Sequence, residues 1–446
     1  MTKKSPIEEL VELIGAVRRR VAPPESARER WLRSLYVPLL LRLETRALSR
    51  VEPNPYCETL TGEAVLGARL PAAPRILVLK LDHIGDFIVA MPAMQHLRDH
   101  FPAAHITLVC GSWTQDWARQ IGLFDRVVVF DGMKRSGPAW TGFSPAVQQS
   151  FTELRLGGFD LAIDLRHDPD TRVLLGQVDA IHRAGFCAPA DQGGASLDLA
   201  LPNVEHVSTA EGTGRPLPAE QRLLLLASAI TNGFARPEHP ALRLMHGGMP
   251  EMAPRRYAIL APGAGGAIRL WNEARLQAVG AFLIAQHDLD LVVIGTEPER
   301  RVAEAFSAAL PAGRVRSAVG LSLAELPNLM RDAVIYVGYD TGPTHLAAAL
   351  GIPTVSVMSG IPCGDVWRVL GDHVAVVRGH AACSPCHLME VSQCPHGVVC
   401  LDVISVEDVV SACRGLLTAD GRAAAPVVSG DHVPQSRAAA VPASLP

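Results

Sequence analysis

RILVLKLDHIGDFIVAMPAMQHLRDHFP, residues 75–102, is the most informative stretch of this chain of 446 residues. Residues 76–79 form a short, continuous, β-rich apolar run, which is typical of a strand covered on both faces in a parallel sheet. The apolar positions that follow have the spacing of a helix: Phe87, Ile88, Met91, Met94 and Leu97. The stretch therefore predicts a strand, a turn and a helix, and parallel sheets bind their ligands at such carboxyl ends of strands.

The turn DHIGD, residues 82–86, brings two carboxylates and a glycine to that end of the strand. Gly85 permits a positive φ or the close approach of another backbone. Asp86 lies at or near the start of the predicted helix, where a plain N-cap and a functional carboxylate are both open.

The chain repeats the alternation of strand and helix in two sets. Further strands are predicted at 106–109, 127–130 and 161–165 in the first set, and at 257–260, 291–294, 334–337 and 354–358 in the second. A polar stretch rich in proline and glycine, residues 236–256, lies between the sets. The pattern predicts an α/β protein with two Rossmann-like parallel-sheet domains, 71–240 and 257–419, whose carboxyl edges face a cleft.

The composition bounds the class of protein. A hydrophobic fraction of 48% with 19% charged residues predicts a soluble globular protein. The formal net charge of −4 gives no argument for nucleic acid as a partner. No apolar run reaches the length of a membrane span, and the N-terminus lacks the apolar core of a secretory signal. We therefore expect a cytoplasmic protein.

The two ends of the chain differ from the rest. Residues 1–50 carry eleven Lys and Arg against six Glu, which gives a local charge of +5. Residues 1–70 are predicted to form a basic helical extension, which either packs on the protein's own body or makes peripheral contact with an anionic inner-membrane surface. Residues 420–446 are rich in Ala, Pro, Ser and Gly and predict a disordered tail.

A glycine-rich loop, APGAGGAIRLW at residues 261–271, follows the first strand of the second set. Its small residues, Gly263 among them, let backbone N–H groups approach an anion, and Arg269 adds a positive charge with a bidentate fork. The loop lacks the third glycine of a dinucleotide fingerprint and the Gly-Lys-Ser/Thr of a P-loop. A plain turn is therefore the alternative.

A second loop and helix, GYDTGPTHLAAALGIP at residues 338–353, follow the strand predicted at 334–337. Asp340 or Thr341 can cap this helix, and Gly351 can close it. Capping alone explains these residues, but the free N–H groups of the helix start also form an anion site directed into the predicted cleft. His345 is either a structural histidine or a ligand contact.

Three segments together, residues 81–92, 262–271 and 340–351, resemble glycosyltransferase family nine, the bacterial heptosyltransferases. The resemblance covers most of the chain, residues 75–414, and implies a GT-B fold, in which two Rossmann-like domains face a cleft. It implies inverting transfer of a heptose from ADP-heptose to a lipopolysaccharide core sugar. The lipid-linked glycan acceptor would bind the N-terminal domain, and the nucleotide-sugar donor the C-terminal domain.

The resemblance also implies roles for individual residues. The Gly-Asp of the first motif is Gly85-Asp86, and the Asp86 carboxylate would be the general base. Arg269 stands where many members have lysine and would hold the donor diphosphate. The donor ribose would be bound by Glu299, and the donor sugar and phosphate by Asp340, Thr341 and Gly342. We expect that catalysis requires no cofactor.

Other functions remain open. The same type of donor serves transfer to a protein or to a different glycan. A member that kept the fold without catalysis would be a nucleotide-sugar-binding scaffold, although the intact Asp86, Arg269 and Asp340 argue against this. A nucleotide-sugar epimerase on the same architecture would need its own acid and base pair, and nothing in the chain clearly points to one.

Four of the nine cysteines lie close together in the sequence: Cys383, Cys386, Cys394 and Cys400. Disulfides are disfavoured in a reducing cytosol. Only the first pair has the tight C-x-x-C spacing, so the pattern leaves a structural zinc or iron site and four free thiols equally open.

Overall fold

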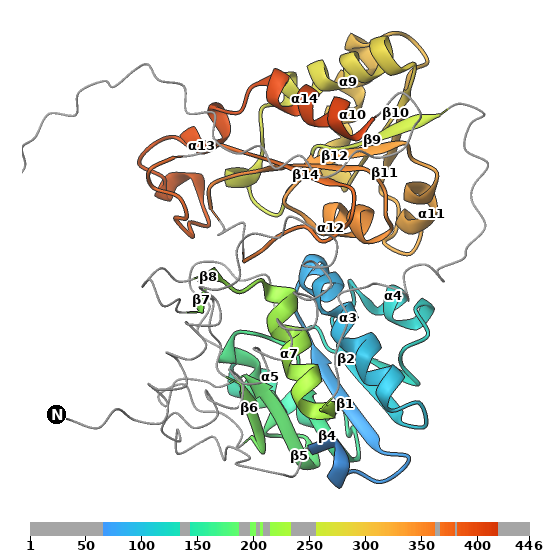
Figure 1. The fold of residues 1–446 in the computed structure, drawn as a ribbon, viewed down its shortest axis with the longest axis vertical. Helices are drawn as coiled ribbons and strands as arrows, with labels where there is room; N and C mark the ends of the chain where they lie inside the picture. Colours follow the sequence, from blue (N-terminus) through green and yellow to red (C-terminus); the bar gives the residue numbers. More distant parts are fainter. Residues whose placement is uncertain are drawn as a thin grey trace, which may run out of the picture.

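The computed structural model (Figure 1) describes residues 66–133, 143–186, 197–201, 206–207, 215–232, 256–361, 366–379 and 381–417. Of the predicted extension 1–70, only its end, the 3-10 helix η1 (Leu66–Arg69), lies among these residues. The predicted membrane contact of residues 1–50 and the predicted tail 420–446 lie outside them. Within the described part of the chain, no helix is both long and apolar enough to cross a bilayer.

The first domain is built on a six-stranded parallel sheet in the order β3-β2-β1-β4-β5-β6. Its strands are β1 (Arg75–Lys80), β2 (His105–Cys110), β3 (Arg126–Val129), β4 (Gly158–Asp164), β5 (Asp179–Phe186) and β6 (Leu199–Leu201). Its helices are α3 (Ile84–His100), α4 (Gln115–Gln120), α5 (Pro145–Thr152), α6 (Arg172–Leu175) and α7 (Ala219–Thr231). A small antiparallel pair, β7 (His206–Val207) and β8 (Arg215–Pro216), lies between β6 and α7 in the sequence.

The second domain repeats this plan with the order β11-β10-β9-β12-β13-β14. Its strands are β9 (Tyr257–Ala261), β10 (Asp290–Gly295), β11 (Val315–Val319), β12 (Ile335–Tyr339), β13 (Thr354–Met358) and β14 (Val374–Arg378). Its helices are α9 (Glu273–His287), α10 (Arg300–Ala309), α11 (Leu326–Arg331), α12 (Gly342–Ala349), α13 (Val399–Asp402) and α14 (Val406–Leu416). Short 3-10 turns are η4 (Ala267–Arg269), η5 (Glu297–Glu299) and η6 (Val391–Gln393).

Both sheets reverse their strand order beside their first strand. In the first sheet β1 lies between β2 and β4, and in the second β9 lies between β10 and β12. Such a reversal leaves a crevice at the carboxyl ends of the two central strands, where doubly wound sheets bind ligands. The turn after β1 and the loops after β9 and β12 therefore occupy the positions that the topology favours for a site.

All eight predicted apolar runs are strands, so the prediction of two parallel α/β domains is confirmed. Six of the described strands were not predicted: β5, β6, β7, β8, β11 and β14. β5 and β11 mix polar with apolar residues and are partly exposed, and β6 has only three residues. These three lack the continuous apolar run that marks a buried parallel strand, whereas β14, VAVVR, has one.

The two domains meet through the N-terminal ends of α3 and α12, which pack against each other (Figure 1). A Cβ atom on Gly342 would lie 2.5 Å from Cγ2 of Ile84 and 3.3 Å from the backbone nitrogen of Gly85. A Cβ atom on Gly85 would in turn lie 3.3 Å from Cδ2 of His345. The helices can approach this closely because both positions lack a side chain.

Other contacts between the domains lie beside this one. The Trp117 indole on α4 donates a hydrogen bond to the carbonyl of Leu323. Arg368 lies between β13 and β14 in the second domain, and Glu220 lies at the start of α7 in the first. Nε of Arg368 donates a 2.6 Å hydrogen bond to Oε1 of Glu220. The contact between the domains is therefore partly apolar and partly ionic.

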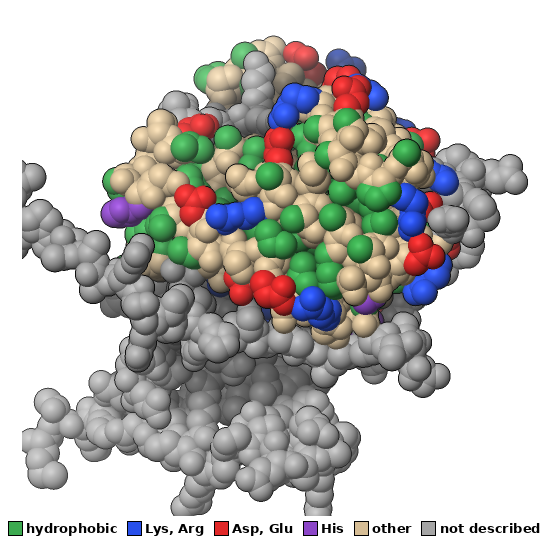
Figure 2. Space-filling model, turned by 90° about the horizontal axis from the view of Figure 1, so that it is seen from above, with side chains coloured by type: hydrophobic (Ala, Val, Ile, Leu, Met, Phe, Trp, Pro, Cys, Tyr) green, Lys and Arg blue, Asp and Glu red, His purple; other side chains and the backbone are tan. Residues whose placement is uncertain are grey.

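The outer face of the second domain, formed largely by α9, α10 and α14, intersperses acidic, basic and apolar side chains (Figure 2). Exposed ion pairs account for several of its charges, among them Arg301 with Glu273 and Arg414 with Glu407, each at 2.6 Å. The described part of this face carries no basic patch of the kind that binds nucleic acid, in agreement with the small net charge.

The contact between the helix starts is testable by substitution. Gly342→Ala puts a methyl group into space held by Ile84, and such overpacking costs about 1–3 kcal/mol of unfolding free energy. Gly265→Ala is the matched control, because a Cβ atom there would meet nothing within 4 Å. Urea denaturation should find only the Gly342 variant destabilised, and equal stability of the two variants would contradict the described packing.

Candidate active site

Asp86 lies in the first turn of α3, close to the contact between the domains. The helix begins at Ile84 with His83 in the N-cap position, so the alternative of Asp86 as N-cap is wrong: it is the third residue of the helix. Its side chain is half-buried. A carboxylate in the first turn of a helix is stabilised by the helix dipole.

Four charged side chains of the first domain form a network of ion pairs, and one of them, Lys80, interacts with Asp86 through its charge. Nζ of Lys80, at the end of β1, lies 2.6 Å from Oδ2 of Asp82 and donates a 2.8 Å hydrogen bond to the carbonyl of Leu165. Arg166 contacts the other oxygen of Asp82 and also pairs with Asp170 at 2.6 Å. Each buried charge thus has an opposite partner, as burial requires.

Burial and charge shift the pKa values of this group. Burial lowers the pKa of Lys80 to about 7, against the attraction of Asp86. Burial raises the pKa of Asp86, and the charges of Lys80 and His345 oppose the rise. Asp86 therefore has the character of a carboxylate that accepts a proton more readily than an exposed one.

Asp340 and His345 face Asp86 from the second domain. Asp340 directly follows β12, Thr341 is the N-cap of α12, and His345 lies one turn into that helix. Nε2 of His345 is 3.8 Å from Oδ1 of Asp340. Burial would raise the pKa of Asp340, but the nearby His345, aided by Arg269, holds it below its usual value.

His345 is also the residue that joins the two halves of the site. It is buried, and its ring lies against Gly85 of the first domain while it pairs with Asp340 of the second. Its charge acts on both Asp86 and Asp340. His345 can therefore be a structural histidine between the domains and a ligand contact at the same time.

The glycine-rich loop turns through η4 and brings Arg269 to the same region. The guanidinium is half-buried, acts on Asp340 by its charge, and has no hydrogen bond with any described residue. Asn272 caps the next helix, α9, by accepting a hydrogen bond from the N–H of Arg275. A partly buried cation without a bonded anion is suited to an anionic ligand.

Glu299 packs against two glycines. A Cβ atom on Gly263 would lie 2.7 Å from Cδ of Glu299, and one on Gly295 would lie 2.6 Å from its Cβ. Oε2 of Glu299 accepts hydrogen bonds from the N–H and the hydroxyl of Thr296, both at 2.7 Å. This carboxylate is thereby fixed beside the glycine-rich loop, and Oε1 faces Gly263.

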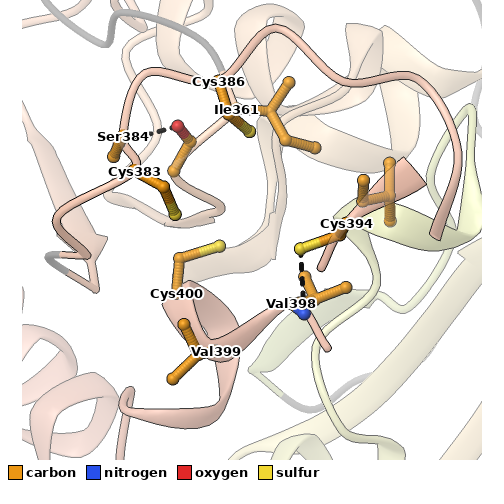
Figure 3. Close-up of a pocket in the computed structure, with 10 residues that line it drawn as sticks. Ile361, Cys383, Ser384, Cys386, Cys394, Val398, Val399 and Cys400 are labelled. Carbon is orange, nitrogen blue, oxygen red and sulfur yellow. Dashed lines mark hydrogen bonds between the residues drawn. The ribbon is translucent and has the colours of Figure 1, made fainter. Parts of the chain in front are cut away.

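The four clustered cysteines line one small pocket (Figure 3). Sγ of Cys394 accepts a 3.3 Å hydrogen bond from the N–H of Val398. All four are free thiols, and among the described residues no group of three or more His, Cys, Asp or Glu side chains has a metal-binding arrangement. The predicted grouping of the thiols is present, and the predicted metal stays a prediction.

The cysteine-rich segment, residues 383–400, packs against the loops that follow β9 and β13. Ile268, next to Arg269, lines the cysteine pocket together with Gly360 and Ile361 after β13. The hydroxyl of Ser384 donates to the carbonyl of Gly360 at 2.6 Å. The segment is therefore positioned to fix the loops that follow β9 and β13.

Sequence analysis placed Asp82 in the predicted functional turn but assigned no role to it, to Lys80 or to Arg166. The available signal was a lysine that ends an apolar strand and directly precedes the predicted functional turn. Nothing local connects Lys80 or Asp82 to Arg166, because that contact depends on the pairing of β1 with β4.

Comparison with known proteins gives a consistent result. The sequence model of glycosyltransferase family 9 (heptosyltransferase) matches residues 149–395. A search of curated proteins finds no match. Escherichia coli ADP-heptose lipopolysaccharide heptosyltransferase II is 18% identical with a TM-score of 0.55, over 76% of this chain and 97% of that one.

Two further solved structures share the fold. The Escherichia coli heptosyltransferase WaaC with ADP is 18% identical over 76% of this chain and 98% of that one, with a TM-score of 0.57. A glycosyl transferase family 9 protein from Veillonella parvula is 18% identical over 76% of this chain and 96% of that one, with a TM-score of 0.56. These similarities confirm the predicted GT-B architecture.

The buried charge network predicts a large effect for Asp82→Asn. The change leaves Lys80 buried without its anionic partner, and breaking a buried pair in this way costs about 3–5 kcal/mol of unfolding free energy. Asp116→Asn is the control, because its pair with Arg119 is exposed and contributes little. Urea denaturation should separate the two variants, and a small effect of Asp82→Asn would contradict the network.

Proposed function

Because this chain belongs to glycosyltransferase family 9, the heptosyltransferase family, we propose that it is an inverting transferase that moves a heptose from ADP-heptose to a lipopolysaccharide core sugar. The observation that carries the proposal is the meeting of two helix starts, with Asp86 on one and Asp340 with His345 on the other. The helix starts and Arg269 supply the positive potential that a nucleotide diphosphate requires.

In the proposed reaction Asp86 is the general base. It takes the proton of an acceptor hydroxyl while the hydroxyl oxygen forms a bond to the anomeric carbon of the donor sugar. The bond from that carbon to the diphosphate oxygen breaks, and its electron pair leaves with ADP. Attack opposite the leaving group inverts the anomeric carbon.

The leaving group needs stabilisation as its charge grows. Arg269 and the free N–H groups at the start of α12 would supply it, since preorganised donors and charges act most strongly in a dry site. Thr341 and Gly342 form that helix start. Glu299, fixed beside Gly263, is the proposed contact for the donor ribose.

The donor is proposed from the relatives. The structure of WaaC contains ADP, and heptosyltransferase II is named for ADP-heptose and lipopolysaccharide. Transfer to a protein or to a different glycan is the second candidate, because it would use the same donor site. A cytoplasmic location, peripheral at the inner membrane through residues 1–50, belongs to the proposal as well.

We also propose a structural zinc or iron at Cys383, Cys386, Cys394 and Cys400. Four thiols lining one pocket match the ligands that these metals take, and the N–H bond to Cys394 suits a thiolate. The metal would hold the cysteine-rich segment, and the transfer itself would require no cofactor.

Removal of the base tests the reaction. Asp86→Asn should reduce the turnover of ADP-heptose with a heptose-free core acceptor about a hundredfold or more, because the general base is lost. Its affinity for ADP should stay close to that of the native protein. Asp99→Asn, at the exposed end of the same helix, is the control. Unchanged turnover in the Asp86 variant would sink the assigned role.

Lys80→Met tests the electrostatics through pH. Activity requires ionised Asp86 and falls as the pH drops through the pKa of that carboxyl. The charge of Lys80 lowers this pKa, so its removal raises the pKa and the acid limb of kcat/KM moves to higher pH. An acid limb that stays in place, or moves to lower pH, would show that Lys80 does not act on the base.

Metal analysis of the purified native protein tests the cysteine site. Stoichiometric zinc or iron is expected, and substitution of Cys383 and Cys386 by serine should abolish it. Substitution of Cys110, which is buried in the first domain, should leave the metal content unchanged. Native protein without zinc or iron would contradict the proposed site.

A further inference from the structure

Arg378, the last residue of β14, lies in line with Asp340 across the carboxyl edge of the second sheet. Met358 pairs directly with Arg378 in the register of β13 and β14. Tyr339 pairs with Val357 in the register of β12 and β13, so Asp340 is level with Met358. Side chains directly opposite each other project from the same face of a sheet. Asp340, Met358 and Arg378 therefore form a row across three strands.

This row lies on the face that α12 covers. Tyr336 projects from the same face of β12 as Asp340, since side chains alternate along a strand. Its hydroxyl lies 3.1 Å from Oγ1 of Thr344 in α12. The row thus lies at the edge where α12 begins, beside the candidate site.

The Arg378 guanidinium has no anionic partner within hydrogen-bonding distance among the described residues. It is half-buried, its Nε is buried without a hydrogen bond, and its Nη2 lies 3.8 Å from Sδ of Met358. Met358 lies between Arg378 and Asp340 in the row. The Arg378 side chain contacts Met358 and therefore extends over β13 towards Asp340. The charge of Arg378 acts on Asp340, which already pairs with His345.

Other arginines of this protein, unlike Arg378, are neutralised by direct ion pairs with carboxylates. Arg314, in the same domain, pairs with Asp290 at 2.6 Å and with Asp288 at 2.9 Å. Buried Arg172 contacts Asp164 directly. A half-buried cation without such a partner is costly, so its presence at a ligand-binding edge indicates an anion supplied from outside.

A second polar group at this edge also lacks a partner. Ser359, which follows Met358, is 1% exposed, and its Oγ has no hydrogen bond among the described residues. The end of β13 thus carries a buried hydroxyl without a hydrogen bond, one residue beyond the methionine that contacts Arg378. This hydroxyl and the Arg378 guanidinium can both donate to acceptor oxygens, which a phosphate group has in number.

We propose that Arg378 is a second arginine contact for the diphosphate of the donor, on the opposite side of Asp340 from Arg269. The inference rests on the proposed function, because it requires a nucleoside diphosphate sugar as the donor. β9 and β13 flank β12 on its two sides, so Arg269 and Arg378 approach Asp340 from opposite neighbours. Together they would neutralise the charge that grows on the leaving diphosphate while Asp86 takes the acceptor proton.

Arg378→Met tests the contact, because it removes the charge and keeps an apolar chain beside Met358. Calorimetric titration of the full chain should find the affinity for ADP reduced about tenfold or more, as loss of a charge-assisted hydrogen bond predicts. The affinity for adenosine should change less than about twofold, within the range of a neutral contact. Arg378→Lys should keep part of the ADP affinity, since it keeps the charge.

The melting temperature and a control variant distinguish a loss of ADP binding from a loss of folding stability. The melting temperature of Arg378→Met should not fall, because the change removes a half-buried charge that lacks a partner. Arg301→Met is the control: this arginine lies on α10, is 71% exposed and pairs with Glu273. Its affinity for ADP should equal that of the native protein.

The outcomes discriminate between the inference and the proposed function. If native protein binds ADP and Arg378→Met binds it equally well, the inference is overturned and the proposed function stands. Equal losses for ADP and adenosine with a lowered melting temperature would show a structural role and also overturn it. If the native protein prefers UDP or GDP, the same comparison is made with that nucleotide and its nucleoside. Native protein that binds no nucleoside diphosphate would overturn both.

Discussion

The close approach of two helix starts is the constraint on which the rest of the site depends. Gly85 and Gly342 lie where α3 and α12 meet, and a side chain on Gly342 would collide with Ile84. Each helix start presents unpaired N–H groups and the positive end of a dipole. Two like dipole ends repel, so the arrangement needs negative charge between them, and Asp86 and Asp340 supply part of it.

This constraint also sets the electrostatics of the two carboxyl groups. Burial raises the pKa of Asp86, whereas His345 and the arginines on either side hold the pKa of Asp340 below its usual value. Two neighbouring carboxyl groups with pKa values pushed apart can take different roles, one as a proton acceptor and one as a permanent anion. Lys80 and Asp82 extend the same system into the core of the first domain.

Local features of the fold could be predicted from the sequence, and long-range ones could not. The C-terminal glycine of α12, Gly351, has the positive φ of +81° that its place after the helix predicts. The position of Asp86 at the end of a strand could be predicted because strand, turn and helix are adjacent in sequence. The pairing of Arg166 with Asp82 and the row from Asp340 to Arg378 depend on strand order, which no local pattern encodes.

The nucleotide-sugar site between the helix starts can be tested by calorimetric titration of the native protein and of Arg269→Ala with ADP, UDP, GDP and ADP-heptose. We expect the native protein to bind ADP and ADP-heptose selectively, and Arg269→Ala to bind both more weakly, because the diphosphate loses a charged partner. Native protein that binds none of the four would contradict a nucleotide-sugar site between the helix starts.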